Sequence, residues 1–240
     1  MNKTYCFSDL HGMKVFWDSI KEIMDETDKA YCLGDVIDRG EDGYNMAKEI
    51  LEDPRIIYLK GNHEDMFVNS ARRTIARNKK REDLGFAFCK AFEIHYYNGG
   101  ESTEIGWFAD KCPEDIINKL DNLPYYATYI NKNGFKIFLS HAGSEYPFEE
   151  TIDKLDAFTK NDLLWDRDHY LFDWPEDTTY DIMIHGHTPI PYVDGAPKNL
   201  KNMKPYVYCD NHKIAIDTGC FDTGEFIVLD LDTFEYIHIS

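Results

Sequence analysis

The sequence predicts an α/β fold in which the functional loops gather at one edge of the strands. Short apolar runs rich in β-branched and aromatic residues recur along the 240 residues, and helix-like segments separate the first three runs. Such alternation predicts parallel strands joined by helical crossovers, with functional loops at the carboxyl ends of the strands. The expected strands are Thr4–Phe7, Ala30–Leu33, Ile56–Leu59, Phe135–Leu139, Ile182–Ile184, Ile214–Ile216 and Phe226–Leu229.

Helical periodicity appears in three places. Phe16, Ile20 and Ile23 lie along one helix face, and a second apolar face includes Met46 and Ile50. From roughly residue 65 to residue 123 the pattern is mainly helical. We therefore expect a single domain, residues 1–240, with a helical insertion at about 65–123.

Charge and cysteine usage narrow the function classes. The chain has 44 acidic and 26 basic side chains, a net charge of −18, which disfavours binding to nucleic acid or to an anionic membrane. The six cysteines are dispersed and form no Cys-x-x-Cys pair, so reduced thiols are expected. We find no apolar stretch long enough for a signal peptide or a membrane span, and the expected location is the cytoplasm.

Polar residues that can bind metal follow five of the expected strands. Any one cluster could be an ordinary loop or the start of a helix. Five clusters in order, each directly after a strand, argue against coincidence, because the carboxyl ends of strands meet at a common rim. The clusters are Ser8-Asp9-Leu10-His11-Gly12, Gly34-Asp35-Val36-Ile37-Asp38-Arg39-Gly40, Gly61-Asn62-His63-Glu64, His141-Ala142-Gly143 and Gly186-His187-Thr188.

Together these clusters resemble the phosphoprotein-phosphatase family of calcineurin-like metallophosphoesterases, and the resemblance spans nearly the whole chain. It implies a central β-sandwich of mixed sheets flanked by helices, and a phosphoesterase that hydrolyses phosphate monoesters with water or hydroxide bridging two metal ions. The implied ligands are Asp9 and His11 for one metal, Asn62, His141 and His187 for the other, and Asp35 for both. Such ligands suit Mn²⁺, which we expect first, and also Fe or Zn.

The same resemblance assigns roles to four further residues. His63 matches the acid that protonates the leaving group, and Asp38 matches the carboxylate that orients it. Arg39 and Arg167 match the arginines that bind phosphoryl oxygens. For Arg167, a surface arginine paired with a neighbouring aspartate is the alternative.

Several segments look like the bacterial and phage members, among them small serine/threonine protein phosphatases and symmetrical dinucleoside tetraphosphatases. They are Asn98-Gly99-Gly100 with Thr103, Leu123-Pro124, Gly186-His187-Thr188-Pro189 and Ile216-Asp217-Thr218-Gly219-Cys220. The leading hypothesis is a serine/threonine protein phosphatase-like enzyme acting on phosphorylated protein or peptide. The alternative is a symmetrical bis(5'-nucleosyl)-tetraphosphatase acting on a nucleotide, and a non-catalytic binding module is the third reading. An acidic open groove would favour peptide, and an aromatic slot beside basic residues would favour adenine.

The remaining polar features have simpler explanations. A basic cluster runs from Arg72 to Arg81 and is expected to be a solvated helix end, although it could attract an anionic part of the substrate. His185 is expected to point away from the metals. The histidines without a motif are expected to be structural or exposed; they are His95, His169, His212 and His238.

Overall fold

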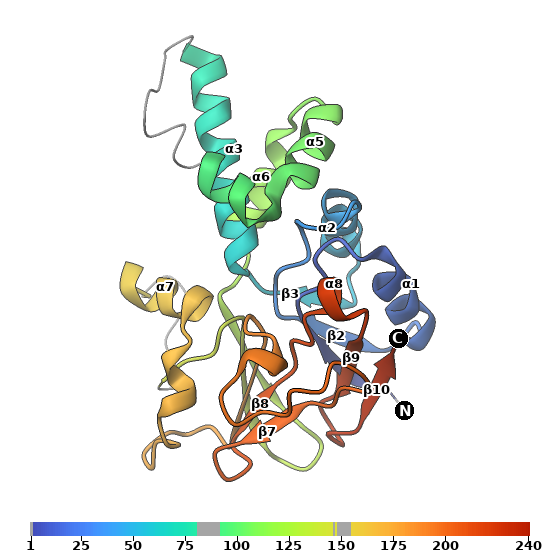
Figure 1. Ribbon diagram of the computed structural model, residues 1–240, viewed down its shortest axis with the longest axis vertical. Coiled ribbons are helices and arrows are strands. Elements are labelled where there is room, and N and C mark those ends of the chain that lie inside the picture. The colour runs from blue at the N-terminus through green and yellow to red at the C-terminus, as the bar shows by residue number, and fades with distance from the viewer. Residues whose placement is uncertain (1, 81–91, 146, 148–154) are drawn as a thin grey trace.

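The structure is a computed structural model that describes residues 2–80, 92–145, 147 and 155–240. Two mixed five-stranded sheets form its centre (Figure 1). The first has the order β10-β9-β1-β2-β3 and consists of β1 (Thr4–Phe7), β2 (Lys29–Cys32), β3 (Ile56–Tyr58), β9 (Phe226–Asp230) and β10 (Tyr236–Ile239). The second has the order β4-β5-β6-β8-β7 and consists of β4 (Tyr126–Ile130), β5 (Lys136–Ser140), β6 (Ile182–His185), β7 (Tyr206–Tyr208) and β8 (Lys213–Ala215).

All seven apolar runs singled out in the sequence form strands, and each matches its expected range to within one or two residues. In the first sheet β1, β2 and β3 are parallel, whereas β9 runs antiparallel to β1. In the second sheet β5, β6 and β8 are parallel, and β4 and β7 run antiparallel at its edges. The carboxyl ends of six parallel strands therefore carry the connecting loops.

Alternation along the strands sorts side chains between two cores. Cys6 of β1 packs with Ile137 and Leu139 of β5 in the apolar layer between the sheets. Its neighbour Phe7 points the other way and joins Trp17 in the core beneath the helices. Because successive strand residues face opposite sides, one apolar run supplies both cores.

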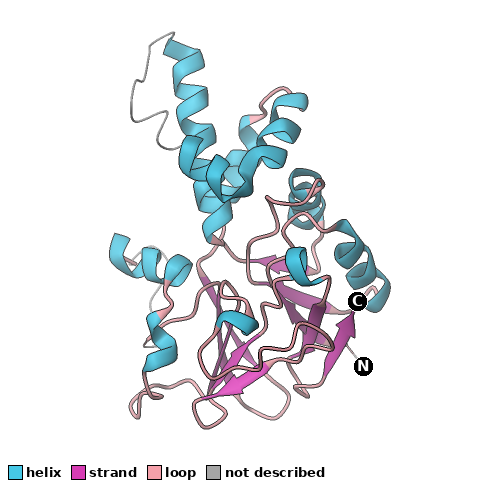
Figure 2. Cartoon of the chain, in the orientation of Figure 1, coloured by secondary structure: helices cyan, strands magenta, loops and turns pink. Residues whose placement is uncertain are grey.

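Helices cover the outer faces of the sheets (Figure 2). Helix α1 (Lys14–Ile23) and helix α2 (Gly43–Glu52) follow β1 and β2 and bury their apolar faces on the first sheet. Helix α7 (Ala157–Trp165) places Leu163 against Phe138 on the outer face of the second sheet. The short helical turns are η3 (Asp168–Leu171), η4 (Ile190–Tyr192) and α8 (Cys220–Thr223).

The segment between β3 and β4 is helical in its described parts and rises above the carboxyl edge of the sheets (Figure 1). Helix α3 (Asn62–Lys80) starts directly in the third polar cluster. The π-helical turn η1 (Tyr96–Gly100), α5 (Glu101–Ala109) and α6 (Glu114–Asp121) follow. Over the described residues, none of the helices combines the length and apolar character that crossing a bilayer requires.

Candidate metal centre and active site

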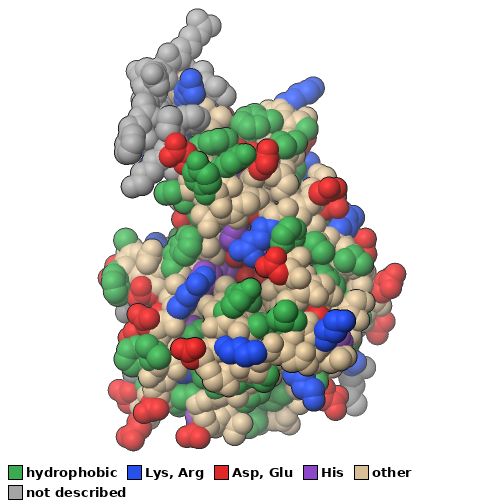
Figure 3. All heavy atoms as spheres, viewed as in Figure 1, with side chains coloured by type: hydrophobic (Ala, Val, Ile, Leu, Met, Phe, Trp, Pro, Cys, Tyr) green, Lys and Arg blue, Asp and Glu red, His purple; other side chains and the backbone are tan. Residues whose placement is uncertain are grey.

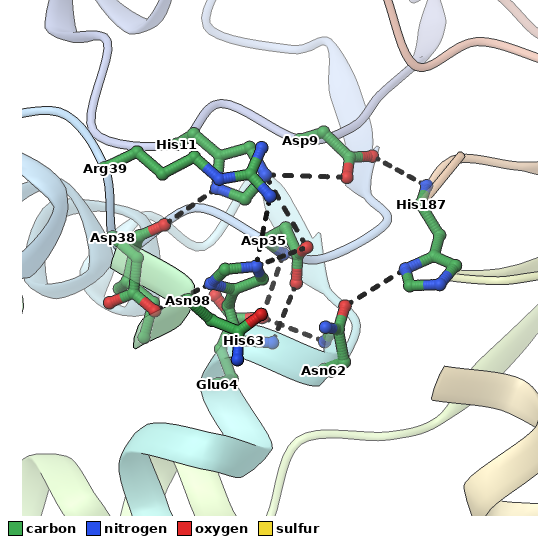
Figure 4. A network of polar contacts seen from close by, with 12 residues as sticks. Asp9, His11, Asp35, Asp38, Arg39, Asn62, His63, Glu64, Asn98 and His187 are labelled. Atoms are coloured by element: carbon green, nitrogen blue, oxygen red, sulfur yellow. Dashed lines mark hydrogen bonds and ion pairs between the residues drawn. The ribbon is translucent and has the colours of Figure 1, made fainter. Parts of the chain in front are cut away.

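Five loops at the carboxyl ends of β1, β2, β3, β5 and β6 converge on one buried cluster (Figure 4). Backbone hydrogen bonds join the loops across the sheets. The amide of His11 donates to the carbonyl of Asp35 at 2.9 Å, and the amide of Gly186 donates to the carbonyl of His141 at 2.8 Å. The loops therefore position one another, and the side chains that they carry have a fixed frame.

The backbone of this cluster is strained. Six of the predicted site residues have positive φ, including Asp9 at 57°, Asp35 at 53° and His187 at 66°. Side chains other than glycine rarely adopt this region, and such residues gather at functional sites where the surrounding structure imposes the conformation. Gly61 shows how tight the frame is, because an added Cβ there would collide with the carboxylate of Asp35. The strain turns the polar side chains toward a common centre.

Asp35 occupies that centre. Its Oδ2 lies 3.7 Å from Nε2 of His11, 3.8 Å from Nε2 of His63 and 3.4 Å from Nε2 of His141. The side chain is buried between the two sheets' loops. A carboxylate with imidazoles on opposite sides has the position that a shared ligand between two cations requires.

Two groups of donor atoms meet at Asp35. One contains His11, Asp35 and His63, and the other contains Asp35, His141 and His187, with the donor atoms of each group within 4.8 Å of one another. Asn62 extends the second group, since its Oδ1 lies 2.8 Å from Nε2 of His141 and 3.1 Å from Nδ1 of His187.

Asp9 lies on the first side, with Oδ1 at 4.0 Å from Nε2 of His11. The six side chains predicted to bind metal thus lie together. Asp35 is shared by both groups, and each of the other five belongs to one group or lies beside it. His63, which the sequence predicted only as the general acid, also contributes a donor atom to the first group.

The chemistry of this cluster fits bound cations. Oδ1 of Asp9 is buried and has no hydrogen-bond partner within the described residues. Burial raises the pKa of Asp35 well above its usual range, and the charge of Asp9 raises it further. Burial lowers the pKa of His11 and of His187, so their rings are neutral and offer lone pairs. Buried carboxyl groups that lack a compensating positive charge, next to neutral imidazoles, form a suitable binding site for divalent cations.

His63 and Asp38 form a buried hydrogen-bonded pair beside the cluster. Nδ1 of His63 donates to Oδ2 of Asp38 at 2.7 Å. Burial alone would lower the pKa of His63, but the charge of Asp35 and the hydrogen bond to Asp38 raise it above its ordinary value. Burial would likewise raise the pKa of Asp38, yet hydrogen bonds from His63 and His95 hold it well below its usual range. The pair therefore favours the protonated imidazole of His63 facing a carboxylate, and Nε2 of His63 lies on the side of Asp35.

Both predicted arginines reach the cluster. The guanidinium Nη2 of Arg39 lies 3.5 Å from Nε2 of His63, and Nε of Arg167 lies 3.4 Å from Nε2 of His187. Asp166, the suggested alternative partner of Arg167, instead contacts the ring of His169. Figure 3 shows cationic side chains beside histidines in the hollow below the helical segment. Each of the two metal groups thus has one arginine beside one of its histidines.

Glu64 supports the site in a way that the sequence did not reveal. Its carboxylate accepts hydrogen bonds from the amides of Asp35, Val36 and Gly61 and from the hydroxyl of Tyr58, at 2.7–3.0 Å. Because the first turn of α3 presents this carboxylate, it ties the loops after β2 and β3 together. Its position directly after Asn62-His63 was the available signal.

His95 is the second residue that sequence patterns did not assign to the site. It is fully buried and lies between the carboxylates of Asp38 and Glu104. Thr103 also donates to Asp38, with 2.6 Å between Oγ1 and Oδ1. The Asn98-Gly99-Gly100 motif lies within η1; His95 directly precedes this turn, and Thr103 belongs to α5, which directly follows it.

The other histidines lie apart from the metal groups. His185 is buried, and its Nε2 is 2.8 Å from the hydroxyl of Tyr208 and 3.4 Å from Nε2 of His169. His212 stacks on Trp174, and His238 is hydrogen-bonded to Glu225. None of these four belongs to the metal groups found among the described residues.

The basic cluster is only partly described. Arg72 is exposed and pairs with Asp121 of α6 at 2.8 Å. The side chains of Lys79, Lys80 and Arg81 lie outside the described part of the chain. An attraction of this segment for anionic substrate stays a prediction.

Fold and site together define a metallophosphoesterase. Residues 3–216 match the family model of the calcineurin-like phosphoesterases, and the chain belongs to this family. An uncharacterized protein of Methanocaldococcus jannaschii is 24% identical over 188 residues, which cover 77% of this chain and 60% of that protein.

Solved structures share the fold at low sequence identity. A candidate diadenosine tetraphosphatase aligns with a TM-score of 0.59 and 13% identity over 99% of this chain and 93% of that chain. A serine/threonine phosphatase from Saccharomyces cerevisiae aligns with a TM-score of 0.56 and 14% identity, over 99% of this chain and 79% of that chain. A metallophosphoesterase from Sphaerobacter thermophilus aligns with a TM-score of 0.55 and 13% identity, over 100% of this chain and 88% of that chain.

Proposed function

We propose that this protein is a two-metal phosphomonoesterase of the serine/threonine protein phosphatase type. The observation that carries the proposal is the placement of Asp35 at the centre of two donor groups, with the His63–Asp38 pair at its side. Two divalent cations held by the predicted ligands would supply a nucleophilic water near neutral pH and neutralise phosphoryl charge. We propose Mn²⁺ as the first choice, with Fe or Zn as alternatives. The six ligands would be Asp9, His11, Asp35, Asn62, His141 and His187.

The protein's own residues would bind the phosphoryl group and move one proton. Arg39, beside His63, and Arg167, beside His187, would donate hydrogen bonds to its non-bridging oxygens. As the oxygen of water forms its bond to phosphorus, the ester P–O bond breaks and its electron pair passes to the leaving oxygen. His63 gives its Nε2 proton to that oxygen, so that the products are an alcohol and inorganic phosphate. Asp38 keeps the imidazolium oriented and charged before the transfer.

A cavity of about 450 Å³ borders Arg39 and bears on the choice of substrate. Glu101 contributes an acidic group to its wall and Ile105 contributes apolar surface; within the described part of the chain, Arg39 is its only cationic lining residue. An open, partly apolar cavity with a carboxylate suits the side chains that flank a phosphorylated residue in a peptide. A polyphosphate chain would meet the charge of Glu101. This contrast supports phosphopeptide as the leading substrate class.

A nucleotide substrate has its own supporting observation. Tyr96 and Phe221 line the same cavity, and both rings are partly exposed. Exposed aromatic rings beside an arginine can stack an adenine base. Symmetrical hydrolysis of a dinucleoside tetraphosphate is therefore the second candidate function.

Turnover of p-nitrophenyl phosphate with added Mn²⁺ tests the enzymatic proposal. We expect the metal-loaded protein to hydrolyse this ester, and the His63→Ala variant to lose at least about 100-fold in kcat for phenyl phosphate, whose leaving group needs the proton of a general acid. His238→Ala is the matched control, because this histidine pairs with Glu225 outside the metal groups. A metal-loaded protein inert towards aryl phosphates, phosphopeptides and dinucleoside tetraphosphates alike would instead be a binding module.

The substrate class is decided by kcat/KM values for a phosphothreonine peptide and for diadenosine tetraphosphate, measured side by side. This ratio reports differential binding of the two transition states. We expect the peptide to be preferred. A preference for the dinucleotide that Tyr96→Ala abolishes would select the second candidate.

A further inference from the structure

We propose that His95 is a positioning residue for the general acid: it clamps the carboxylate of Asp38 so that Asp38 can hold the His63 ring toward the leaving group. This inference rests on the proposed phosphoesterase function. It adds a residue that touches neither the metal ligands nor the substrate and acts through Asp38 alone.

The geometry of the His95 ring shows which form it takes. Its Nε2 lies 3.0 Å from both carboxylate oxygens of Asp38, and its Nδ1 lies 3.0 Å from Oε1 of Glu104. A neutral imidazole has one N–H and can donate to only one of these carboxylates. When both of these buried carboxylates are ionised, only the doubly protonated ring can donate to the two of them. His95 is therefore a buried cation that bridges two anions.

The far end of this bridge is anchored to the helix that carries the acid. Oε1 of Glu104 also accepts a hydrogen bond of 2.6 Å from Oγ of Ser70. Ser70 belongs to α3, whose first turn contains His63. A series of hydrogen bonds thus runs from His63 through Asp38, His95 and Glu104 to Ser70. It begins and ends on α3, and it fixes the position of Asp38 relative to His63.

Packing alone does not explain a histidine at this place. The ring of His95 lies 5.4 Å from that of Phe67, a contact that any aromatic side chain could make. An apolar ring, however, would leave two buried carboxylates with one partner fewer each. Burial lowers the pKa of His95, but hydrogen bonds to Asp38 and then Glu104 outweigh it and raise this pKa to about 9, in keeping with the charged form.

Leaving-group dependence distinguishes positioning from support of the fold. Protonation of the leaving oxygen matters greatly for phenol, a weak acid, and little for the far more acidic p-nitrophenol. We therefore expect His95→Phe to lower kcat for phenyl phosphate by about 10- to 100-fold, since misplacement of a catalytic group has costs of this order. For p-nitrophenyl phosphate the loss should stay below about threefold.

Two further variants complete the experiment. Glu104→Gln keeps the His95 ring in place but removes the second anion. It should show the same dependence on the leaving group with smaller losses. This variant also tests the proposal should His95→Phe not fold. Trp107→Phe alters packing around Phe67 without touching the bridge, and it should affect both substrates equally. Metal content should equal that of the parent in all three, because neither His95 nor Glu104 contacts a predicted ligand.

The possible results separate the two proposals. A leaving-group-selective loss in His95→Phe or Glu104→Gln supports the positioning role. Equal losses on both substrates, or no loss in either variant, would overturn it while the parent's activity still supports the phosphoesterase. A metal-loaded parent inert towards aryl phosphates, phosphopeptides and dinucleoside tetraphosphates alike would refute the phosphoesterase itself and this role with it.

Discussion

Oε2 of Glu64 accepts a hydrogen bond of 2.8 Å from the backbone amide of Asp35, so the first turn of α3 supports the residue at the centre of the metal cluster. The same carboxylate binds the amides of Val36 and Gly61. Each of these amides is buried and needs an acceptor, which this carboxylate supplies. The site is thus held by a side chain that does not face its interior.

Replacing Glu64 by Gln should destabilise the protein strongly. The amide group would present donors to buried N–H groups, and hydrogen bonds to a charged acceptor contribute about 1.5–3 kcal/mol each. We expect the free energy of unfolding to fall by about 3 kcal/mol or more, measured by urea denaturation. Tyr58→Phe removes a single donor to the same carboxylate and should cost about 1.5 kcal/mol, the lower end of that range. Equal effects of the two changes would contradict the proposed support.

Asp35→Asn should weaken binding at both metal positions. An amide oxygen lacks the charge that a ligand shared by two cations provides, so we expect fewer than two metal ions per chain after equilibrium dialysis and elemental analysis. Asp28→Asn is a matched control, because Asp28 is also buried but lies before β2, at the opposite edge of the sheet from the site. Retention of both metals in Asp35→Asn would refute the assignment of Asp35 as the shared ligand.

Arg39→Lys should weaken the binding of phosphate and leave metal content unchanged. Lysine keeps the charge but cannot make the paired hydrogen bonds of a planar guanidinium. We expect the inhibition constant of inorganic phosphate to rise by about tenfold, the equivalent of about 1.4 kcal/mol. Arg167→Lys should act in the same direction, because Arg167 lies beside His187 of the second metal group. Inhibition as strong as in the parent would show that Arg39 does not bind phosphate.

The parts of the fold that sequence patterns predicted are those with continuous burial. Strand β1 is almost wholly buried and appears in the sequence as an apolar run. Strands β4, β7 and β10 were not predicted, because each is largely half-buried or exposed, as an edge or antiparallel strand can be. All three lie at the edges of their sheets, where a strand is only partly covered and its burial gives little sequence pattern to detect.

The residues of the candidate site likewise differ in how far the sequence predicts them. Its metal-binding side chains follow strand ends directly, so local patterns together with a family resemblance were enough to name them. The role of His95 depends on Asp38, which lies 57 residues away in the chain, and on Glu104. Contacts of this kind exist only after η1 and α5 pack against the loop following β2, and no spacing within the sequence encodes them.

The charge state of His95 leads to a prediction about pH. Its pKa is raised to about 9 by Asp38, from the loop after β2, and by Glu104 of α5, against the effect of burial. A histidine whose pKa is higher in the folded than in the unfolded chain stabilises the fold fully below the unfolded value of about 6.5. That stabilisation is lost as pH rises through about 9.

We therefore expect the free energy of unfolding to decline between about pH 7 and pH 9.5, by up to about 3 kcal/mol from this group. Urea denaturation across this range measures the decline. Long-range ¹H–¹⁵N spectra report the ring directly, and both nitrogens of His95 should carry protons at about pH 7.5, since that pH lies below the folded pKa. In Glu104→Gln the midpoint should move to lower pH, because one of the two anions that hold the proton is gone. A His95 ring that is singly protonated at about pH 7.5 would refute the buried cation, since a group with this raised pKa must still hold its second proton there.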